Sequence, residues 1–195
     1  MVNFVDRIHA VFNNHTLRSV FQKIRYPIFI VVFILLIQKI EPAWFLPGIL
    51  VSLFGELIQF WSFASLDKNK TLSVQGPYTL TRNPMYLGRF FLLLGCVVLT
   101  SSIWLILAFC VLYYFYVVSR VKREESKLRP LFGANYETYC HKVNRFIPSF
   151  RELDLGSLWF FKWKLLFQNH GHWNMLAVLC CYATFYYFTF IRANR

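Results

Sequence analysis

Charge is scarce in this chain, and negative charge is the scarcest. Only 15% of the 195 residues are charged, and 9 Asp and Glu stand against 21 Lys and Arg. An average globular chain has about 25% charged residues and roughly 45–50% apolar ones. Here apolar residues reach 57%, so the composition excludes an ordinary soluble domain and indicates an integral membrane protein.

Motifs that mark other classes of protein are also missing. The sequence has no Gly-rich phosphate loop, no Ser-centred elbow and no His-Glu-x-x-His motif. The five cysteines lack metal or redox spacing, and His170 and His172 lack supporting ligands, so we expect no metal. The net charge of +12 forms no soluble basic face, so we expect no nucleic-acid partner. The first 25 residues show no cleavable signal peptide.

Long apolar runs are what the chain has instead. A helix needs about 20 residues to cross roughly 30 Å of hydrocarbon. Apolar runs of suitable length occupy residues 26–40, 44–66, 85–100, 103–118 and 173–191. The sequence therefore predicts an all-α, multi-pass membrane bundle of about five transmembrane helices. A cytosolic helical C-terminal segment is expected to close a pocket against it.

Basic residues orient the predicted bundle. They gather in segments 1–25, 66–84 and 120–164, whereas the linkers 38–43 and 101–102 hold only Lys39. Because positive residues mark the cytoplasmic side, we expect most of the polar mass to face the cytosol.

Three regions follow along the chain. We expect an interfacial N-terminal segment at 1–25 and a membrane-embedded core at 26–150. A C-terminal extension at 151–195 would carry aromatic and Lys-rich sequence at the headgroup level, followed by a last transmembrane helix.

Turn-forming residues are dense in the stretch 76–88, which reads GPYTLTRNPMYLG. One interpretation is a helix start, with Asn83 as N-cap, Pro84 in the first turn and Arg82 as a topology anchor. A helix start does not require the Gly-Pro-Tyr or the Tyr-Leu-Gly. The other interpretation is therefore a ligand site, since free N–H groups at a helix start bind carboxylates or phosphates.

A second cytosolic segment begins as a helix. Arg120, Glu124 and Leu128 recur at i, i+4 and i+8 and share one face, and Glu125 is spaced to pair with Arg129. The first pair is either a solvated ion pair worth a few tenths of a kcal/mol or the wall of a site. In a site, Arg120 would bind an anionic group and Glu124 an ammonium or a hydroxyl.

The end of this segment also has a predicted form. Pro130 and Gly133 stop the helix, and a short second helix at 134–143 places Tyr136 and Tyr139 on one side. Residues 145–148, Arg-Phe-Ile-Pro, would then be extended.

Glu56 lies in the middle of an apolar run. A carboxylate inside hydrocarbon costs at least about 2.5–3.5 kcal/mol on insertion scales, so it needs a partner or a wet cavity. Arg89 is one candidate partner. The alternative is a neutral Glu56 that is hydrogen-bonded within the bundle.

Taken together, the cytosolic motifs carry a resemblance. The order G-P-Y-x3-R-N-P-M-Y-L-G, R-x3-E-E-x2-L-x3-F-G-x2-Y-x2-Y and R-F-I-P over residues 55–148 resembles the isoprenylcysteine carboxyl methyltransferase family. Phospholipid N-methyltransferases belong to the wider group, and the Arg-Asn-Pro-Met-Tyr-Leu-Gly stretch resembles bacterial-type members. The resemblance implies a multi-span enzyme that uses S-adenosyl-L-methionine and methylates a lipid-like acceptor from the bilayer. That acceptor is an isoprenoid or lipid-linked carboxylate, or a lipid amine, and the membrane is the bacterial inner membrane or the endoplasmic reticulum.

The resemblance also assigns residues by motif position. Arg120 and Glu124 would be catalytic, with Arg120 holding the acceptor group, and we expect Glu56 to contribute to substrate binding. The cofactor would contact Lys70, Thr71, Leu72, Ser73, Tyr78, Asn83, Pro84, Met85, Tyr86 and Glu124.

Two departures and two alternatives accompany the resemblance. Prenylcysteine enzymes usually have His where Asn83 stands, and Val-Pro where this chain has Val143-Asn-Arg. An NADPH-dependent sterol or steroid reductase has a similar C-terminal helical arrangement. A non-catalytic scaffold or transport subunit is the other alternative, and the sequence does not predict an oligomeric state.

Overall fold

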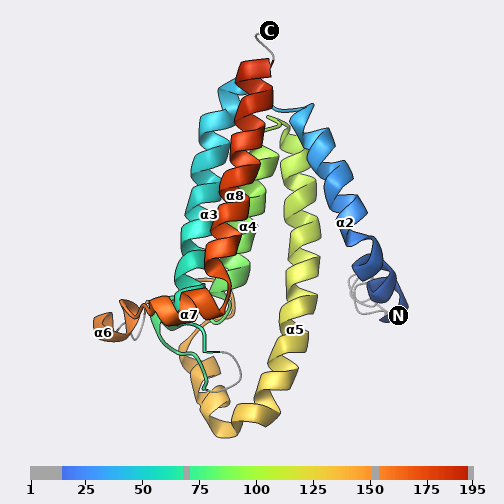
Figure 1. Ribbon diagram of the computed structural model, residues 1–195. Helices are drawn as coiled ribbons and strands as arrows, with labels where there is room; N and C mark the ends of the chain where they lie inside the picture. Colours follow the sequence, from blue (N-terminus) through green and yellow to red (C-terminus); the bar gives the residue numbers. More distant parts are fainter. Residues whose placement is uncertain (1–14, 68–70, 151–153, 193–195) are drawn as a thin grey trace.

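The computed structural model describes residues 15–67, 71–150 and 154–192. All regular structure in these ranges is helical, as predicted (Figure 1). The elements are α2 (His15–Ile37), η1 (Pro42–Trp44), α3 (Phe45–Ser65), η2 (Gly76–Thr79), α4 (Pro84–Val98), α5 (Ile103–Lys142), α6 (Leu155–Leu158), α7 (Trp163–Gln168), α8 (Gly171–Tyr186) and η3 (Tyr187–Arg192).

Three helical stretches in the described ranges are long and apolar enough to cross a membrane: Pro42–Ser65, Ile103–Lys142 and Gly171–Arg192. Helix α4 is apolar but has 15 residues, which corresponds to about 22 Å at 1.5 Å per residue. The protein is therefore a multi-span membrane protein, and the predicted count of about five spans is not confirmed.

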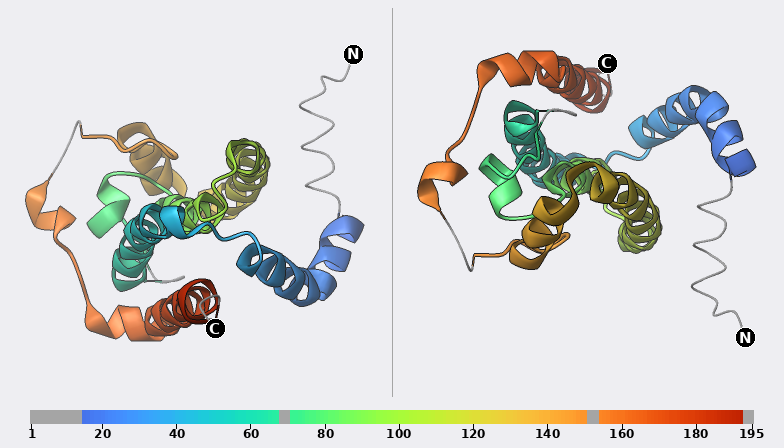
Figure 2. Two further views of the ribbon diagram at one scale, coloured as in Figure 1. Left: turned by 90° about the horizontal axis from the view of Figure 1, so that it is seen from above. Right: turned by 90° about the horizontal axis from the view of Figure 1, so that it is seen from below.

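The predicted N-terminal segment lies partly outside the described residues. From His15 onward the chain is already helical, and α2 continues through Pro27 to Ile37. Helix α2 stands to one side of the other long helices (Figure 2). Its apolar side chains are largely exposed, for example Phe29 at 59%, as expected for a helix that contacts lipid.

Helices α3, α4 and α8 lie side by side and form the packed centre of the bundle (Figures 1 and 2). Glycines allow α3 and α4 to approach closely. A Cβ atom on Gly55 would lie 2.3 Å from the backbone nitrogen of Leu92, and one on Gly95 would lie 2.2 Å from Oγ of Ser52. Small residues at such a contact let helices pack in the absence of a hydrophobic driving force between them.

Helix α5 extends beyond the bundle and then turns back. The predicted break is confirmed, because Gly133 has a φ of 51° and a ψ of −130° within the helix. Beyond α5 the chain returns to the loop before α4. The backbone N–H of Arg82 donates to the carbonyl of Asn144 (2.9 Å), and that of Ser149 donates to the carbonyl of Leu80 (2.8 Å). The first and third sequence motifs therefore lie together at one end of the bundle.

The C-terminal extension packs against the same end of the bundle. Helix α6 lies to the side of the bundle, α7 leads from it to the base of α8, and α8 then returns along α3 (Figure 1). Asn169 fixes this turn, since its amide Nδ2 donates to the carbonyls of Phe63 (2.9 Å) and Leu66 (2.7 Å). Carbonyls at a helix C-terminus lack partners within the helix, so Asn169 satisfies groups that would otherwise need water.

Candidate functional site

A cavity of about 420 Å³ opens between the loop that precedes α4 and the C-terminal half of α5. Eight residues that the resemblance assigned to the cofactor line it: Thr71, Leu72, Ser73, Tyr78, Asn83, Met85, Tyr86 and Glu124. Pro84 is buried at the start of α4 beside it, and Lys70 lies outside the described residues. Residues more than 30 positions apart in the sequence thus face one space.

Three of the predicted residues form what we call the pocket cluster: Tyr86, Arg120 and Glu124. The Tyr86 hydroxyl donates to Oε1 of Glu124 (2.7 Å), and Nε of Arg120 donates to the Tyr86 hydroxyl (3.1 Å). Arg120 and Glu124 form the predicted i, i+4 ion pair at 3.0 Å, with side chains 42% and 40% exposed. Both charges are therefore accessible to a ligand, although Arg120 lies next to the cavity and does not line it.

Aromatic residues make the opposite wall. Tyr136 and Tyr139 lie on one side of the helix after Gly133, as predicted, and both are buried with ring centres 6.4 Å apart. The Tyr139 hydroxyl donates to the carbonyl of Tyr78 (2.7 Å) and so holds η2 in place. Burial, and then the nearby Glu124 carboxylate, raise the pKa of Tyr78 above its ordinary value. Its phenol therefore remains neutral at physiological pH.

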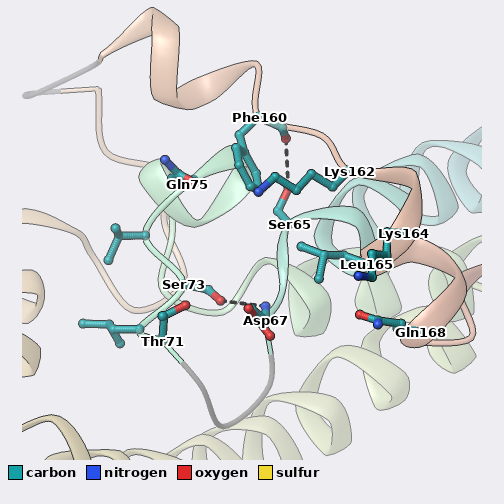
Figure 3. A pocket seen from close by; sticks show the side chains of 12 residues that line it. Ser65, Asp67, Thr71, Ser73, Gln75, Phe160, Lys162, Lys164, Leu165 and Gln168 are labelled. Atoms are coloured by element: carbon teal, nitrogen blue, oxygen red, sulfur yellow. Dashed lines mark hydrogen bonds between the residues drawn. The ribbon is translucent and has the colours of Figure 1, made fainter.

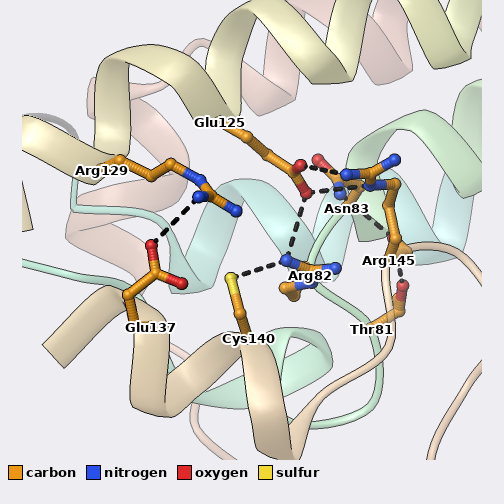
Figure 4. A network of polar contacts seen from close by, with 8 residues as sticks. All are labelled: Thr81, Arg82, Asn83, Glu125, Arg129, Glu137, Cys140 and Arg145. Atoms are coloured by element: carbon orange, nitrogen blue, oxygen red, sulfur yellow. Dashed lines mark hydrogen bonds and ion pairs between the residues drawn. The ribbon is translucent and has the colours of Figure 1, made fainter. Parts of the chain in front are cut away.

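Glu125 belongs to a different set of contacts, shown in Figure 4, which we call the ion-pair cluster: Arg82, Glu125 and Arg145. Glu125 pairs with Arg82 at 3.3 Å and with Arg145, and its side chain is 7% exposed. The predicted pair with Arg129 is wrong. The break at Gly133 folds the chain back, so Arg129 pairs with Glu137 at 3.4 Å while Glu125 faces the loop before α4.

Asn83 connects the loop to the third motif. It occupies the N-cap position of α4, and Pro84 occupies the first turn, as predicted. Its side chain does not cap the helix, however. Instead Nδ2 donates to the carbonyl of Arg145 (3.1 Å), which also accepts a bond from Oγ1 of Thr81 (3.1 Å). Asn83 therefore fixes the segment at 144–149 and also lines the cavity.

Glu56 lies apart from the cavity, ten residues before Leu66 and so about 15 Å away along the α3 axis. Arg89 is not its partner, because that guanidinium lies over the Tyr86 ring at 5.7 Å. Oε2 of Glu56 accepts bonds from Asn174 (2.7 Å) and Gln59 (3.5 Å). The hydrogen-bonded alternative describes this residue, and a role in substrate binding stays a prediction.

Sequence reasoning missed part of the cavity wall. Arg82, a topology anchor under one interpretation of the loop, lines it, as do Phe132 of α5 and Leu128, which the sequence places on the Glu124 face without a role in the site. A local pattern points to the last two, since 120, 124, 128 and 132 continue one i, i+4 series on a single helix face. No local pattern points to Arg82, whose partner Glu125 lies far along the chain.

Comparisons with known proteins agree on the kind of protein. The family model described as phospholipid methyltransferase matches residues 44–135. Over 128 residues the chain is 27% identical to proteins named probable protein-S-isoprenylcysteine O-methyltransferase from Oryza sativa subsp. indica and subsp. japonica, covering 58% of this chain and 67% of theirs. Over 113 residues it is 26% identical to protein-S-isoprenylcysteine O-methyltransferase from Xenopus laevis, covering 52% of this chain and 39% of the frog protein.

No solved structure matches the chain. The family match includes both the loop before α4 and the pocket cluster on α4 and α5. The relatives are plant and frog proteins, so the likeness to bacterial-type members stays a prediction. The chain is thus a distant homologue of the isoprenylcysteine O-methyltransferases, and it is similar to the phospholipid methyltransferase family over just under half of its length.

Proposed function

We propose that this protein transfers a methyl group from S-adenosylmethionine to a lipid-linked carboxylate, and that the cavity beside the pocket cluster holds the cofactor. One observation carries the proposal. A single cavity is lined by residues from 71–86 and by Glu124 of α5. These are residues that the family resemblance assigned to the cofactor. Basic residues are abundant in segments 66–84 and 120–164, which form this end of the bundle, and they support a cytosolic orientation.

The cavity fits the cofactor in size and in chemistry. Its volume of about 420 Å³ is within the roughly 300–1,000 Å³ of small-molecule sites. Leu128, Leu131 and Phe132 give an apolar surface for a flat base. Glu124 is a carboxylate for a ribose hydroxyl or an ammonium. Arg82 has a buried Nε with no hydrogen-bond partner in the described part of the chain, which suits a carboxylate.

When bound, the cofactor supplies an electrophilic methyl group on a positively charged sulfur. The protein then has to align the acceptor with that methyl group and exclude water. Tyr78 and Tyr136 present buried rings to the cavity, and aromatic faces attract cations. Because the pKa of Tyr78 is raised, this wall adds no negative charge of its own.

Arg120 is placed to bind the acceptor. Its Nε is used by Tyr86 and Glu124, while its side chain remains 42% exposed. A guanidinium has a planar fork that suits a carboxylate. A carboxylate needs no general base, whereas an ammonium must first lose a proton. No histidine lines the cavity among the described residues, which supports the carboxylate.

The test uses S-adenosylmethionine labelled in its methyl group, the purified protein and a membrane lipid extract. We expect labelled lipid that releases its label as methanol under mild base, because an ester hydrolyses and an N-methyl amine does not. Arg120→Ala should abolish the labelled product, and Lys39→Ala, on the far side of the bundle, should leave it unchanged. Base-stable label would contradict the carboxylate acceptor but not the methyl transfer.

Binding to the purified protein separates the enzyme alternatives. Calorimetry should detect S-adenosylmethionine and no NADPH. Binding of NADPH alone would favour the reductase, and binding of neither would favour a non-catalytic role. The family match supports neither alternative.

A further inference from the structure

A second cavity of about 440 Å³ lies on the other side of the loop at 71–73 (Figure 3). Helix α7 and the residues before it form its outer wall, so it is built by the C-terminal extension. This extension lies beyond the match to the family at 44–135. We call this space the lysine cavity, because Lys162 and Lys164 both line it.

The walls of the lysine cavity are held by specific contacts. The carbonyl of Phe160 accepts bonds from Nε1 of Trp61 (3.2 Å) and Oγ of Ser65 (3.1 Å), and the backbone N–H of Lys162 donates to the carbonyl of Ala64 (3.0 Å). Gly76, with a φ of 62°, packs so closely that a Cβ atom would lie 2.2 Å from Oγ of Ser65. The segment before α7 is therefore joined to the end of α3.

The lining of this cavity favours an anion. Two lysines, Lys162 and Lys164, line it with one acidic residue, Asp67, and Gln75 and Gln168 add side-chain amides to the lining. Figure 3 shows Lys162 extending toward the Phe160 ring, whose centre lies 5.0 Å from Nζ. Neither lysine forms an ion pair within the described residues. Among the described lining residues, two lysines against one carboxylate therefore leave an excess of positive charge.

Exposed tryptophans indicate where such an anion would come from. Trp159 is 78% exposed and Trp163 is 62% exposed, on either side of the segment that carries Lys162. Tryptophan is enriched at the level of lipid headgroups, and lysines near an acidic membrane surface attract its lipids. The two exposed tryptophans and the lysines therefore suit a position of the lysine cavity at the level of the lipid phosphates.

We propose that the lysine cavity binds the phosphate of an acidic phospholipid headgroup. Thr71, Leu72 and Ser73 line both this cavity and the candidate cofactor cavity. The backbone N–H of Asp67 donates to Oγ of Ser73 (3.1 Å) and so fixes Ser73 in the wall between the two cavities. A headgroup bound in the lysine cavity shifts the position of this shared wall in the candidate cofactor cavity. The affinities for lipid and for cofactor are therefore coupled. Only this coupling rests on the proposed function.

The binding claim is tested without the cofactor, by native mass spectrometry of the purified protein. The protein is released from nanodiscs that contain equal amounts of phosphatidylglycerol and phosphatidylcholine. We expect preferential retention of phosphatidylglycerol, and a loss of about 30-fold in Lys162→Gln/Lys164→Gln, as two interfacial lysines contribute. Equal retention of the two lipids, or unchanged retention in the variant, overturns the proposal.

Matched variants separate charge from fold. Lys23→Gln/Lys39→Gln removes the same charge from exposed positions of α2 and the loop after it and should retain the lipid. Lys162→Arg/Lys164→Arg keeps the charge and should also retain it. If the double glutamine variant fails to fold, Lys164→Gln alone should still lose about fivefold. Full competition by millimolar inorganic phosphate would identify a soluble anion as the ligand and overturn the lipid assignment.

Coupling is then measured as the affinity for S-adenosylmethionine in nanodiscs of each lipid. We expect at least a fivefold difference between phosphatidylglycerol and phosphatidylcholine, a typical size for coupled sites, that disappears in the glutamine double variant. Cofactor binding with no lipid dependence would overturn the coupling. Lipid retention without cofactor binding would instead contradict the proposed function.

Discussion

Glu124 and Glu125 are neighbours in the sequence and differ in almost every physical respect. Glu125 has a 7% exposed side chain and pairs with Arg82 and Arg145. Glu124 has a 40% exposed side chain, pairs with Arg120 and accepts a bond from Tyr86 at the edge of a cavity. On a helix, adjacent side chains point about 100° apart, so one residue step separates the ion-pair cluster from the pocket cluster.

The difference separates polar residues that hold this end of the bundle together from polar residues whose charge stays exposed. The ion-pair cluster joins the loop before α4, helix α5 and the segment after it. Its charges pair with one another, although Nε of Arg82 keeps a donor without a partner in the described residues. The pocket cluster connects only α4 and α5 and keeps exposed charge. Substitutions in the first should therefore change stability, and those in the second should change binding.

The largest expected effect is that of Glu125→Ala. Removing one partner of a buried ion pair leaves the other charge uncompensated, which costs about 3–5 kcal/mol. We expect a large drop in the thermal unfolding midpoint in detergent. Glu137→Ala is the matched control, because its pair with Arg129 is exposed and worth less than about 1 kcal/mol. Equal midpoints for the two variants would remove the distinction between the clusters.

The next effect is on cofactor affinity. Glu124→Gln keeps the shape of the side chain and removes its charge. Losing a hydrogen bond to a charged group should weaken the affinity for S-adenosylmethionine about 10- to 150-fold, as measured by calorimetry. The thermal unfolding midpoint should stay nearly unchanged. Glu137→Gln on the same helix should bind as the parent protein does. Unchanged affinity in Glu124→Gln would refute the assignment of Glu124.

A smaller effect is expected for Tyr86→Phe. This change removes the hydroxyl that joins Arg120 to Glu124, and a typical hydrogen bond contributes about 0.5–1.5 kcal/mol, or roughly two- to tenfold in affinity. Tyr86→Phe and Glu124→Gln together should weaken binding by less than the product of their separate effects. Purely multiplicative effects would indicate that the two side chains act independently.

The smallest effect is expected for Asn83→Ala, which lies between the two clusters. It loses the bond from Nδ2 to the carbonyl of Arg145, so stability should fall by about 0.5–1.5 kcal/mol, read as a shift in the unfolding midpoint. Because Asn83 also lines the cavity, we expect a change in cofactor affinity of less than about threefold. A large affinity loss with no stability loss would move Asn83 into the pocket cluster.

Local patterns predicted the parts of the site that local geometry determines. The i, i+4 spacing predicted the Arg120–Glu124 pair, and Pro130 with Gly133 predicted the break in α5. The same spacing rule failed for Glu125 and Arg129, because a tertiary ion pair with Arg82, 43 residues earlier, is available. The shorter of the two bonds to Glu56 comes from Asn174, 118 residues away on α8, and no local sequence pattern predicts such a contact.

The lysine cavity was also beyond sequence reasoning. Its residues come from the end of α3, the loop after it and the segment at 160–168. Their encounter depends on single contacts, such as that of Ser65 with the carbonyl of Phe160. The aromatic and Lys-rich composition of the C-terminal extension predicts a location at the headgroup level, which stays a prediction, and Trp159 and Trp163 are exposed. Composition alone could not predict a cavity.

The most direct test of the account is to locate the methyl donor. The purified protein is irradiated with labelled S-adenosylmethionine, and the labelled peptides are mapped. The account predicts label within 71–86 and 124–139, competed by unlabelled cofactor and reduced in Glu124→Gln. Label concentrated at 160–168, in the lysine cavity of similar volume, or label that unlabelled cofactor does not compete, would contradict it.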